Sequence, residues 1–167
     1  MRRVFLSSIP LAFLLSVGHP ALCQERSAAM EKLSFMVGEW VIETPADGQV
    51  GTDSCEWLGT AFLTCETLFT SPSGEEVRLL SVYGYDTAME RYTWVRYYSN
   101  GLIDDHIGWL DGDVWRWVQR DSAGGRFRLT VTDVTPTSYS LHWDRSVRGR
   151  NWEPYGTFSE GTARKTG

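Results

Sequence analysis

Closely spaced turn-forming residues are the sequence feature that most constrains the fold, because from Gly38 onward they divide the chain into short segments. Inside these segments apolar and polar residues alternate with a period of two, as in half-buried β-strands. Gly, Pro, Asn, Asp and Ser gather between them, for example at 45–48, 71–74, 99–101 and 122–125. Connections this short leave no room for crossover helices, so successive strands are expected to pair antiparallel.

The pattern predicts a single domain of about ten strands. The predicted strands are 38–44, 52–58, 61–70, 75–86, 90–98, 102–110, 113–120, 126–134, 137–145 and 151–165. An antiparallel meander of this length either closes into a barrel or splits into a sandwich. One weak helical signal precedes the strands, with Ser27 as a fair N-cap and Met30, Leu33 and Val37 on one side, Met36 lying beside them.

The N-terminus has the pattern of a cleaved secretory signal peptide. Two basic residues precede a mostly apolar run over 4–17, and Ala21, Leu22 and Cys23 follow at the positions that a signal peptidase reads. The run is shorter than the roughly 20 residues that span a bilayer. We therefore predict a signal peptide at 1–23 and an exported barrel domain at 24–167.

Two other interpretations of the N-terminus are a retained membrane anchor and a lipoprotein acylated at Cys23. A lipobox requires a small residue before the cysteine, whereas Leu22 stands there. Cleavage would remove two arginines and no carboxylates, which would change the net charge from −5 to −7. An acidic chain without a basic run argues against nucleic acid and against anionic membranes as partners, and no membrane insertion of the mature chain is expected.

Cys55 and Cys65 are the most specific local signal. They flank a hairpin turn around Gly59 and Thr60. If the loop has three residues centred on Thr60, residues whose numbers sum to 120 face each other, and the two cysteines then lie opposite one another. In an oxidising compartment such a pair is expected to form a disulfide, the alternative being two buried free thiols. A redox-active pair is not expected, because no CxxC motif begins a helix.

Aromatic residues mark a candidate binding face. The chain has 8 Trp and 7 Tyr, and alternation places four side chains on one face of the predicted strand 90–98, namely Tyr92, Trp94, Arg96 and Tyr98. We predict that this face lines a ligand cavity. In the alternative orientation Thr93, Val95 and Tyr97 face inward and Arg96 becomes a surface residue. Arg116, opposite Trp115 and Trp117 in its strand, is a second arginine whose direction decides its role.

Four short motifs are distinctive: the segment 33–40 with its Gly-Glu-Trp strand opening, the hairpin 55–65, the strand end 83–86 and the closing segment 161–165. Together they resemble an uncharacterised family of bacterial exported lipocalin-like proteins, a domain of unknown function. The resemblance implies a calycin-type, all-β antiparallel barrel with a short N-terminal helix. In related lipocalins, fatty-acid-binding proteins and nitrobindins, a first-strand Trp closes one end under a last-strand Arg. Here the resemblance implies that Trp40 and Arg164 form this structural pair.

No catalytic constellation is visible in the sequence, so we do not expect an enzyme. Asp104 and Asp105 are adjacent and point to opposite faces of a strand. His106 and His142 lie in separate strands, and no motif offers three metal ligands. No cofactor is therefore expected. A haem alternative follows from the nitrobindin resemblance, with His142 as the candidate ligand.

These observations favour an exported, periplasmic or secreted, non-catalytic barrel. Its partner would be a small apolar or amphipathic molecule, with a carboxylate headgroup if Arg96 or Arg116 faces inward. The alternatives are a haem-binding, nitrobindin-like barrel and an interaction or inhibitor module whose barrel is filled by its own side chains. The sequence does not decide between a hollow and a filled interior, since residues as large as Trp could occupy all of it.

Overall fold

The computed structural model of this chain describes residues 25–44, 50–70, 74–120, 125–147, 151–155 and 159–166. The predicted signal peptide and its cleavage site after Cys23 lie outside the described residues. The described elements begin with α1 (Ala28–Glu31) and a 3-10 turn, η1 (Ser34–Met36). The strands are β1 (Gly38–Glu43), β2 (Val50–Leu58), β3 (Phe62–Thr70), β4 (Glu76–Asp86), β5 (Arg91–Tyr98), β6 (Ile103–Asp111), β7 (Val114–Gln119), β8 (Arg126–Thr132), β9 (Ser138–Ser146), β10 (Glu153–Pro154) and β11 (Glu160–Lys165).

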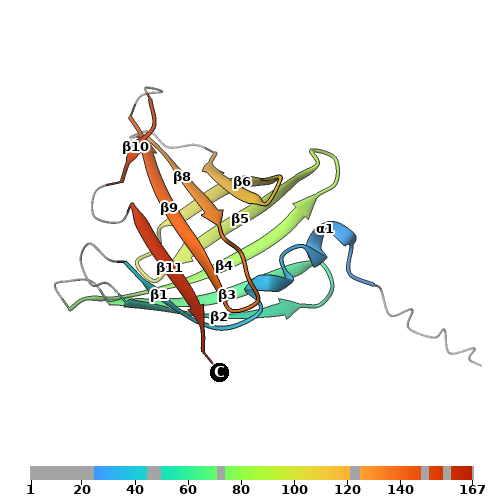
Figure 1. The fold of residues 1–167 in the computed structure, drawn as a ribbon, viewed down its shortest axis with the longest axis horizontal. Coiled ribbons are helices and arrows are strands. Elements are labelled where there is room, and N and C mark those ends of the chain that lie inside the picture. Colours follow the sequence, from blue (N-terminus) through green and yellow to red (C-terminus); the bar gives the residue numbers. More distant parts are fainter. Residues whose placement is uncertain are drawn as a thin grey trace, which may run out of the picture.

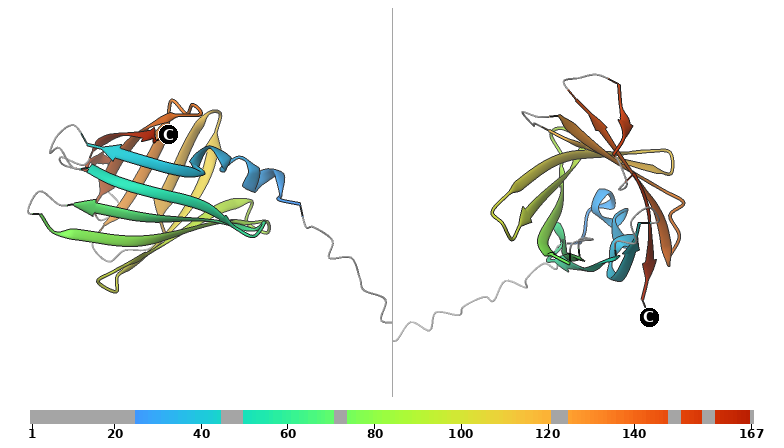
Figure 2. Two further views of the ribbon diagram at one scale, coloured as in Figure 1. Left: turned by 90° about the horizontal axis from the view of Figure 1, so that it is seen from below. Right: turned by 90° about the vertical axis from the view of Figure 1, so that its left-hand side faces the viewer.

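The strands close into an antiparallel barrel, and α1 and η1 lie at one end of it (Figure 1). Strands β1 to β9 pair in sequence order, and β11 lies between β9 and β1 to complete a ring of ten strands. Viewed along its length, the ring encloses the short helical segment (Figure 2, right). The structure therefore confirms the all-β antiparallel meander and shows that it closes into a barrel and not a sandwich. Most strands end within two residues of the predicted positions.

The predicted last strand, 151–165, is interrupted. Its first part, β10, and its second part, β11, pair with the same edge of β9, and β10 lies outside the ring. On the two sides of the interruption, the amide of Tyr155 donates to the carbonyl of Trp143 (3.0 Å), and the amide of Trp143 donates to the carbonyl of Ser159 (2.8 Å). Pro154 has no N–H to donate to a ladder, which favours a strand end at this point.

The helical segment is shorter than its apolar pattern predicted. Ser27 is the N-cap, as expected, with its hydroxyl accepting from the amide of Met30 (3.2 Å). The α-helix then ends after one turn and gives way to the 3-10 turn, whose different period changes the phase of the buried face. As a result Leu33 and Met36 are buried in the barrel, while Val37 is only half-buried.

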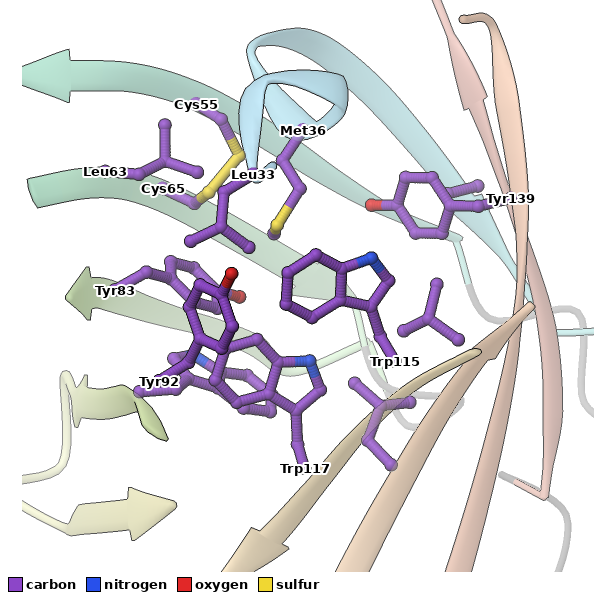
Figure 3. Close-up of a cluster of buried hydrophobic side chains, with 14 of the residues drawn as sticks. Leu33, Met36, Cys55, Leu63, Cys65, Tyr83, Tyr92, Trp115, Trp117 and Tyr139 are labelled. Carbon is purple, nitrogen blue, oxygen red and sulfur yellow. A yellow bond between two sulfur atoms is a disulfide. The ribbon is translucent and has the colours of Figure 1, made fainter. Parts of the chain in front are cut away.

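A layer of aromatic rings packs beneath this segment and closes one end of the barrel (Figure 3). Trp115 and Trp117 stack with ring centres 6.0 Å apart, and Tyr92 meets Trp115 edge-on at 4.8 Å. The hydroxyl of Tyr92 donates to the carbonyl of Ala29 (2.9 Å), which ties the helix to the barrel. Trp117 can lie this deep because Gly108 is beneath it, where a Cβ atom would come within 2.4 Å of the ring.

Candidate ligand-binding cavity

The barrel contains a cavity next to the aromatic layer. A cavity of about 380 Å³ extends from Phe35 and Met36 at the helical end toward Phe69, Phe127 and Tyr155 at the other end. Its walls are mostly apolar and aromatic, with a small number of polar side chains. This volume is within the range of about 300–1,000 Å³ that small-molecule sites usually have.

Three of the four side chains predicted to bind a ligand line this cavity: Trp94, Arg96 and Tyr98. The fourth, Tyr92, is on the same inward face but is buried in the aromatic layer, where it contacts the helical segment and does not line the cavity. On the opposite face of β5, Tyr97 is 45% exposed. The inward orientation of this face is therefore the one in the structure, and its role in ligand binding stays a prediction.

Arg96 meets a protein carboxylate inside the barrel. Its Nη2 lies 2.7 Å from Oδ2 of Asp104, its opposite residue on β6, and its side chain is only 12% exposed. The guanidinium lies against the rings of Trp94 (4.7 Å) and Trp143 (5.3 Å). An arginine in these surroundings needs a counter-charge, and Asp104 supplies it.

Asp104 has further partners that hold it in place. The Tyr98 hydroxyl donates to Oδ2 (2.9 Å), and the Gln119 side-chain amide donates to Oδ1 (3.1 Å). Asp105 points outward toward Arg120 (3.6 Å), so the two adjacent carboxylates take opposite faces as predicted. Arg116 also points outward, where it lies 3.5 Å from Asp111 and does not line the cavity.

Asp53 is a cavity residue that the sequence reasoning missed. It is on β2 next to Thr67 of β3, with which it shares a side-chain hydrogen bond, and it is 9% exposed. Its Oδ1 is buried and has no hydrogen-bond partner among the described residues. Burial raises the pKa of this carboxyl to about 6, and the bond from Thr67 opposes the shift in part. The alternation that places Cys55 inside also places Asp53 inside, and this signal could have found it.

His106 is fully buried in the wall beside the cavity, between Trp94 and Gln119 on the neighbouring strands. Its ring centre is 4.7 Å from that of Trp94. Burial and the nearby Arg96 charge lower its pKa to about 3, against smaller opposing contributions from Asp104 and the main chain of Trp94. The imidazole is therefore neutral at physiological pH.

His142, the candidate haem ligand, lies on the outside of the barrel. Its neighbours Leu141 and Trp143 line the cavity, so alternation directs His142 to the other face of β9. There its Nε2 is 3.1 Å from Oδ1 of Asp144, and its side chain is 42% exposed. A haem inside this barrel could not be bound by His142, and that assignment of the residue is wrong.

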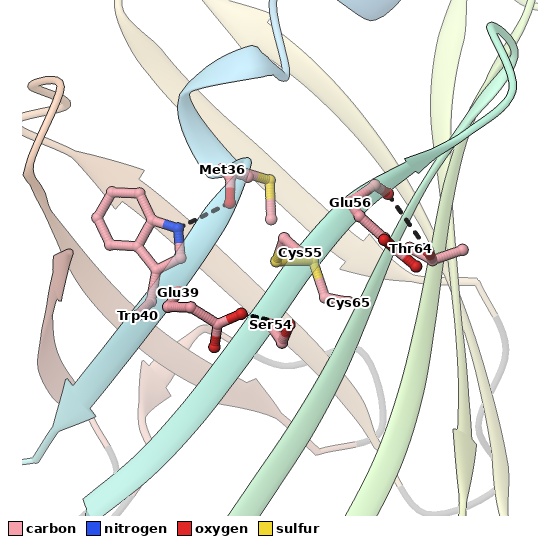
Figure 4. The surroundings of a disulfide bond; sticks show 8 residues. All are labelled: Met36, Glu39, Trp40, Ser54, Cys55, Glu56, Thr64 and Cys65. Atoms are coloured by element: carbon pink, nitrogen blue, oxygen red, sulfur yellow. Dashed lines mark hydrogen bonds between the residues drawn. A yellow bond between two sulfur atoms is a disulfide. The ribbon is translucent and has the colours of Figure 1, made fainter. Parts of the chain in front are cut away.

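The implied pairing of Trp40 with Arg164 is also corrected. Trp40 is buried as expected, and its indole N–H donates to the Met36 carbonyl (2.7 Å; Figure 4). The cation over its ring is Lys165, whose Nζ is 5.5 Å from the ring centre. Lys165 is the residue opposite Trp40 on β11, so the two side chains share a face, whereas Arg164 is opposite Val41 and points to the other face.

The disulfide prediction is confirmed. Cys55 and Cys65 are bonded (S–S 2.07 Å) between directly opposed positions of β2 and β3, with Cα atoms 4.1 Å apart (Figure 4). The pairing of Leu58 with Phe62 in the same hairpin shows the predicted register. Both cysteines are buried under the helical segment, where the bond fixes two strands next to the aromatic layer.

No protein-family model matches this chain, and no curated protein matches it. The lipocalin-like family resemblance therefore stays a prediction beside the observed barrel. In the described part of the chain, no group of three His, Cys, Asp or Glu side chains is placed to hold a metal ion. None of the described helices has the length and apolar character needed to cross a membrane.

Proposed function

We propose that this protein is an exported, non-catalytic barrel that binds one small, largely apolar molecule. The cavity of about 380 Å³ carries the proposal, because aromatic and aliphatic side chains surround it and the helical segment closes one end. Small barrels enclose single ligands in interiors of this kind. A disulfide is typical of oxidising compartments, which supports the export part of the proposal.

Binding is favoured over catalysis because the polar cluster around Asp104 in the wall is internally paired. Arg96, Tyr98 and Gln119 all bond to Asp104, an arrangement that stabilises the wall and leaves no free acid–base pair there. A nucleophile would need an adjacent base, and no histidine is among the described residues that line the cavity. The same pairing of Arg96 weakens the case for a carboxylate headgroup, since its charge is already balanced.

The proposal is tested with N-phenyl-1-naphthylamine, a neutral apolar dye whose emission rises in apolar surroundings. The mature protein should bind it saturably with one site per chain. Leu79 and Leu80 are neighbours on opposite faces of β4: Leu79 lines the cavity, and Leu80 is 40% exposed. Leu79→Trp should fill the cavity and weaken dye binding at least about tenfold, an energy near 1.4 kcal/mol. Leu80→Trp is the matched control and should bind as the parent does.

Equal dye binding by both variants, or no binding by the parent, would exclude the cavity as the site. The second readout is the mass of any molecule that copurifies with the mature protein after organic extraction. A ligand of the cavity should be recovered from the parent and the Leu80→Trp variant but not from Leu79→Trp.

A further inference from the structure

Four charged side chains line the described cavity: Asp53, Arg96, Asp104 and Glu160. Arg96 and Asp104 form an ion pair with each other, and Glu160 is exposed at the end away from the helix. Asp53 is different, because it is deeply buried and, among the described residues, no Lys, Arg or His lies within ion-pair distance of it.

We propose that the ligand of this cavity carries a cationic amine, and that Asp53 accepts the hydrogen bond of the ammonium group. This inference rests on the proposed function, and it replaces the carboxylate headgroup that the inward arginine had suggested. It names the class of ligand as amphipathic amines with an apolar body and one protonated nitrogen.

The position of Asp53 is the first argument. A carboxylate out of water is costly unless it is paired, and Thr67 provides only one hydrogen bond to it. In the part of the chain that the structure describes, Oδ1 has no hydrogen-bond partner. A protonated amine would supply both the missing donor and the missing counter-charge, so binding would relieve a cost that the free protein bears.

The aromatic surroundings are the second argument. Trp40 is opposite Asp53 on β1, and the Tyr139 ring packs against Trp40 with centres 4.9 Å apart. Burial is the main reason why the pKa values of Tyr83 and Tyr139 are raised, and the charge of Asp53 adds to both shifts. Aromatic faces attract the alkylated surface of an ammonium group, so the rings and the carboxylate favour the same ligand.

The balance of charge is the third argument. Among the described lining residues, three are acidic and one is basic, and the basic one is neutralised by Asp104. Lys165 lies over Trp40 at the helical end and does not line the cavity. An anionic headgroup would therefore meet an uncompensated carboxylate at Asp53, whereas a cation would meet an attractive one.

The experiment compares decylamine, 1-decanol and decanoate as competitors for bound N-phenyl-1-naphthylamine at pH 7.5. These probes share a chain length and differ in headgroup charge. Decylamine should displace the dye at a concentration at least about tenfold lower than decanol, with decanoate the weakest. Asp53→Asn should weaken decylamine about tenfold and leave decanol within about threefold. Glu56→Gln, a change on the outer face of the same strand, should leave all three competitors unchanged.

A second arm varies pH in the parent protein. Other ionisable groups near Asp53 or the cavity are Tyr83 on β4, Tyr98 on β5, His106 on β6, Tyr139 on β9, the Arg96–Asp104 pair, Glu160 and Lys165. Burial lowers the pKa of His106 to about 3, so its charge does not change over this range. The alkylamine stays protonated throughout, so loss of the Asp53 charge should weaken decylamine at least about threefold between pH 7.5 and pH 5, while decanol binding holds. This arm needs no variant, so it decides the inference even if Asp53→Asn does not fold.

The outcomes separate the two proposals. If the dye binds but decanoate or decanol competes as well as decylamine, or Asp53→Asn binds the amine like the parent, the amine inference is overturned and the binding function stands. If the parent does not bind the dye at all, both proposals fail.

Discussion

Asp53 and His106 are buried ionisable residues in one barrel, and burial moves their pKa values in opposite directions. The carboxyl of Asp53 is shifted up to about 6, and the imidazole of His106 is shifted down to about 3. In both cases the folded state favours the neutral form. The two residues therefore contribute to the pH dependence of stability with opposite signs.

For Asp53 the folded pKa lies above the unfolded value of about 3.9. Its stabilising contribution is present below pH 4 and is lost as the pH rises through about 6. Asp53→Asn should therefore raise the unfolding free energy at pH 8 by up to about 3 kcal/mol, and the gain should disappear near pH 4. Urea unfolding at both pH values measures this, with Glu56→Gln as the exposed control. A variant less stable than the parent at pH 8 would contradict the prediction.

For His106 the folded pKa lies below the unfolded value of about 6.5. Its contribution is therefore present above that value and is lost as the pH falls toward 3. The ring resonances of His106 should stay at their neutral positions between pH 8 and pH 5 in a two-dimensional NMR titration. Movement with a midpoint above pH 5 would show that the ring is not isolated from water as the structure places it.

At the scale of elements, the β2–β3 hairpin and the β11–β1 closure hold the helical end together. The hairpin has a covalent cross-link between opposed strands, and the closure places Lys165 over the buried Trp40 ring. Both features stabilise strands that support the aromatic layer, so each can be tested without touching the cavity.

The disulfide prediction concerns a short closed loop with a sequence separation of 10. The double variant Cys55→Ala/Cys65→Ala should have an unfolding free energy lower by about 2–3 kcal/mol. This is near the low end of the usual range for disulfides, because the closed loop is short. Guanidinium unfolding measures the loss. Free-thiol titration of the unfolded, unreduced parent should find no reactive thiol at these two positions, and two reactive thiols there would refute the bond.

Lys165 and Arg164 make a matched pair for the strand closure. Lys165→Ala removes the cation over Trp40 and should cost about 0.5–1 kcal/mol. Arg164→Ala changes an exposed residue and should stay within about 0.5 kcal/mol of the parent. Thermal unfolding of the two variants measures both losses. A larger loss for Arg164→Ala than for Lys165→Ala would indicate that Arg164, and not Lys165, is the cation that stabilises Trp40.

At the scale of the whole molecule, the helical segment covers one end of the barrel and forms part of its core. Leu33 is fully buried there, next to the disulfide and the aromatic rings (Figure 3). Leu33→Ala should lower the unfolding free energy by about 2–5 kcal/mol, because the rigid rings around it cannot collapse into the space. Lys32→Ala, an exposed neighbour, is the control, and equal stabilities would mean that the segment is not part of the core.

The sequence by itself determined the local features of this protein. Turn residues set the strand boundaries, and a side-chain period of two put Tyr92, Trp94, Arg96 and Tyr98 on one face of β5. Which face of that strand points inward was decided by the barrel. The same periodicity and one assumed turn were enough to place Cys55 opposite Cys65. These features depend on residues a few positions apart, or on one hairpin, so short-range stereochemistry decides them.

Only the tertiary structure decided the features that depend on ring closure and volume. The neighbour of Trp40 became Lys165 because the register of β11 against β1 is set by the whole barrel. Whether the interior is hollow was decided by how the aromatic side chains pack inside the closed ring of strands. Within the described ranges Asp53 has no ion-pair partner and Arg96 has one in Asp104, because strand register and barrel closure decide which side chains meet inside. No local pattern encodes that pairing.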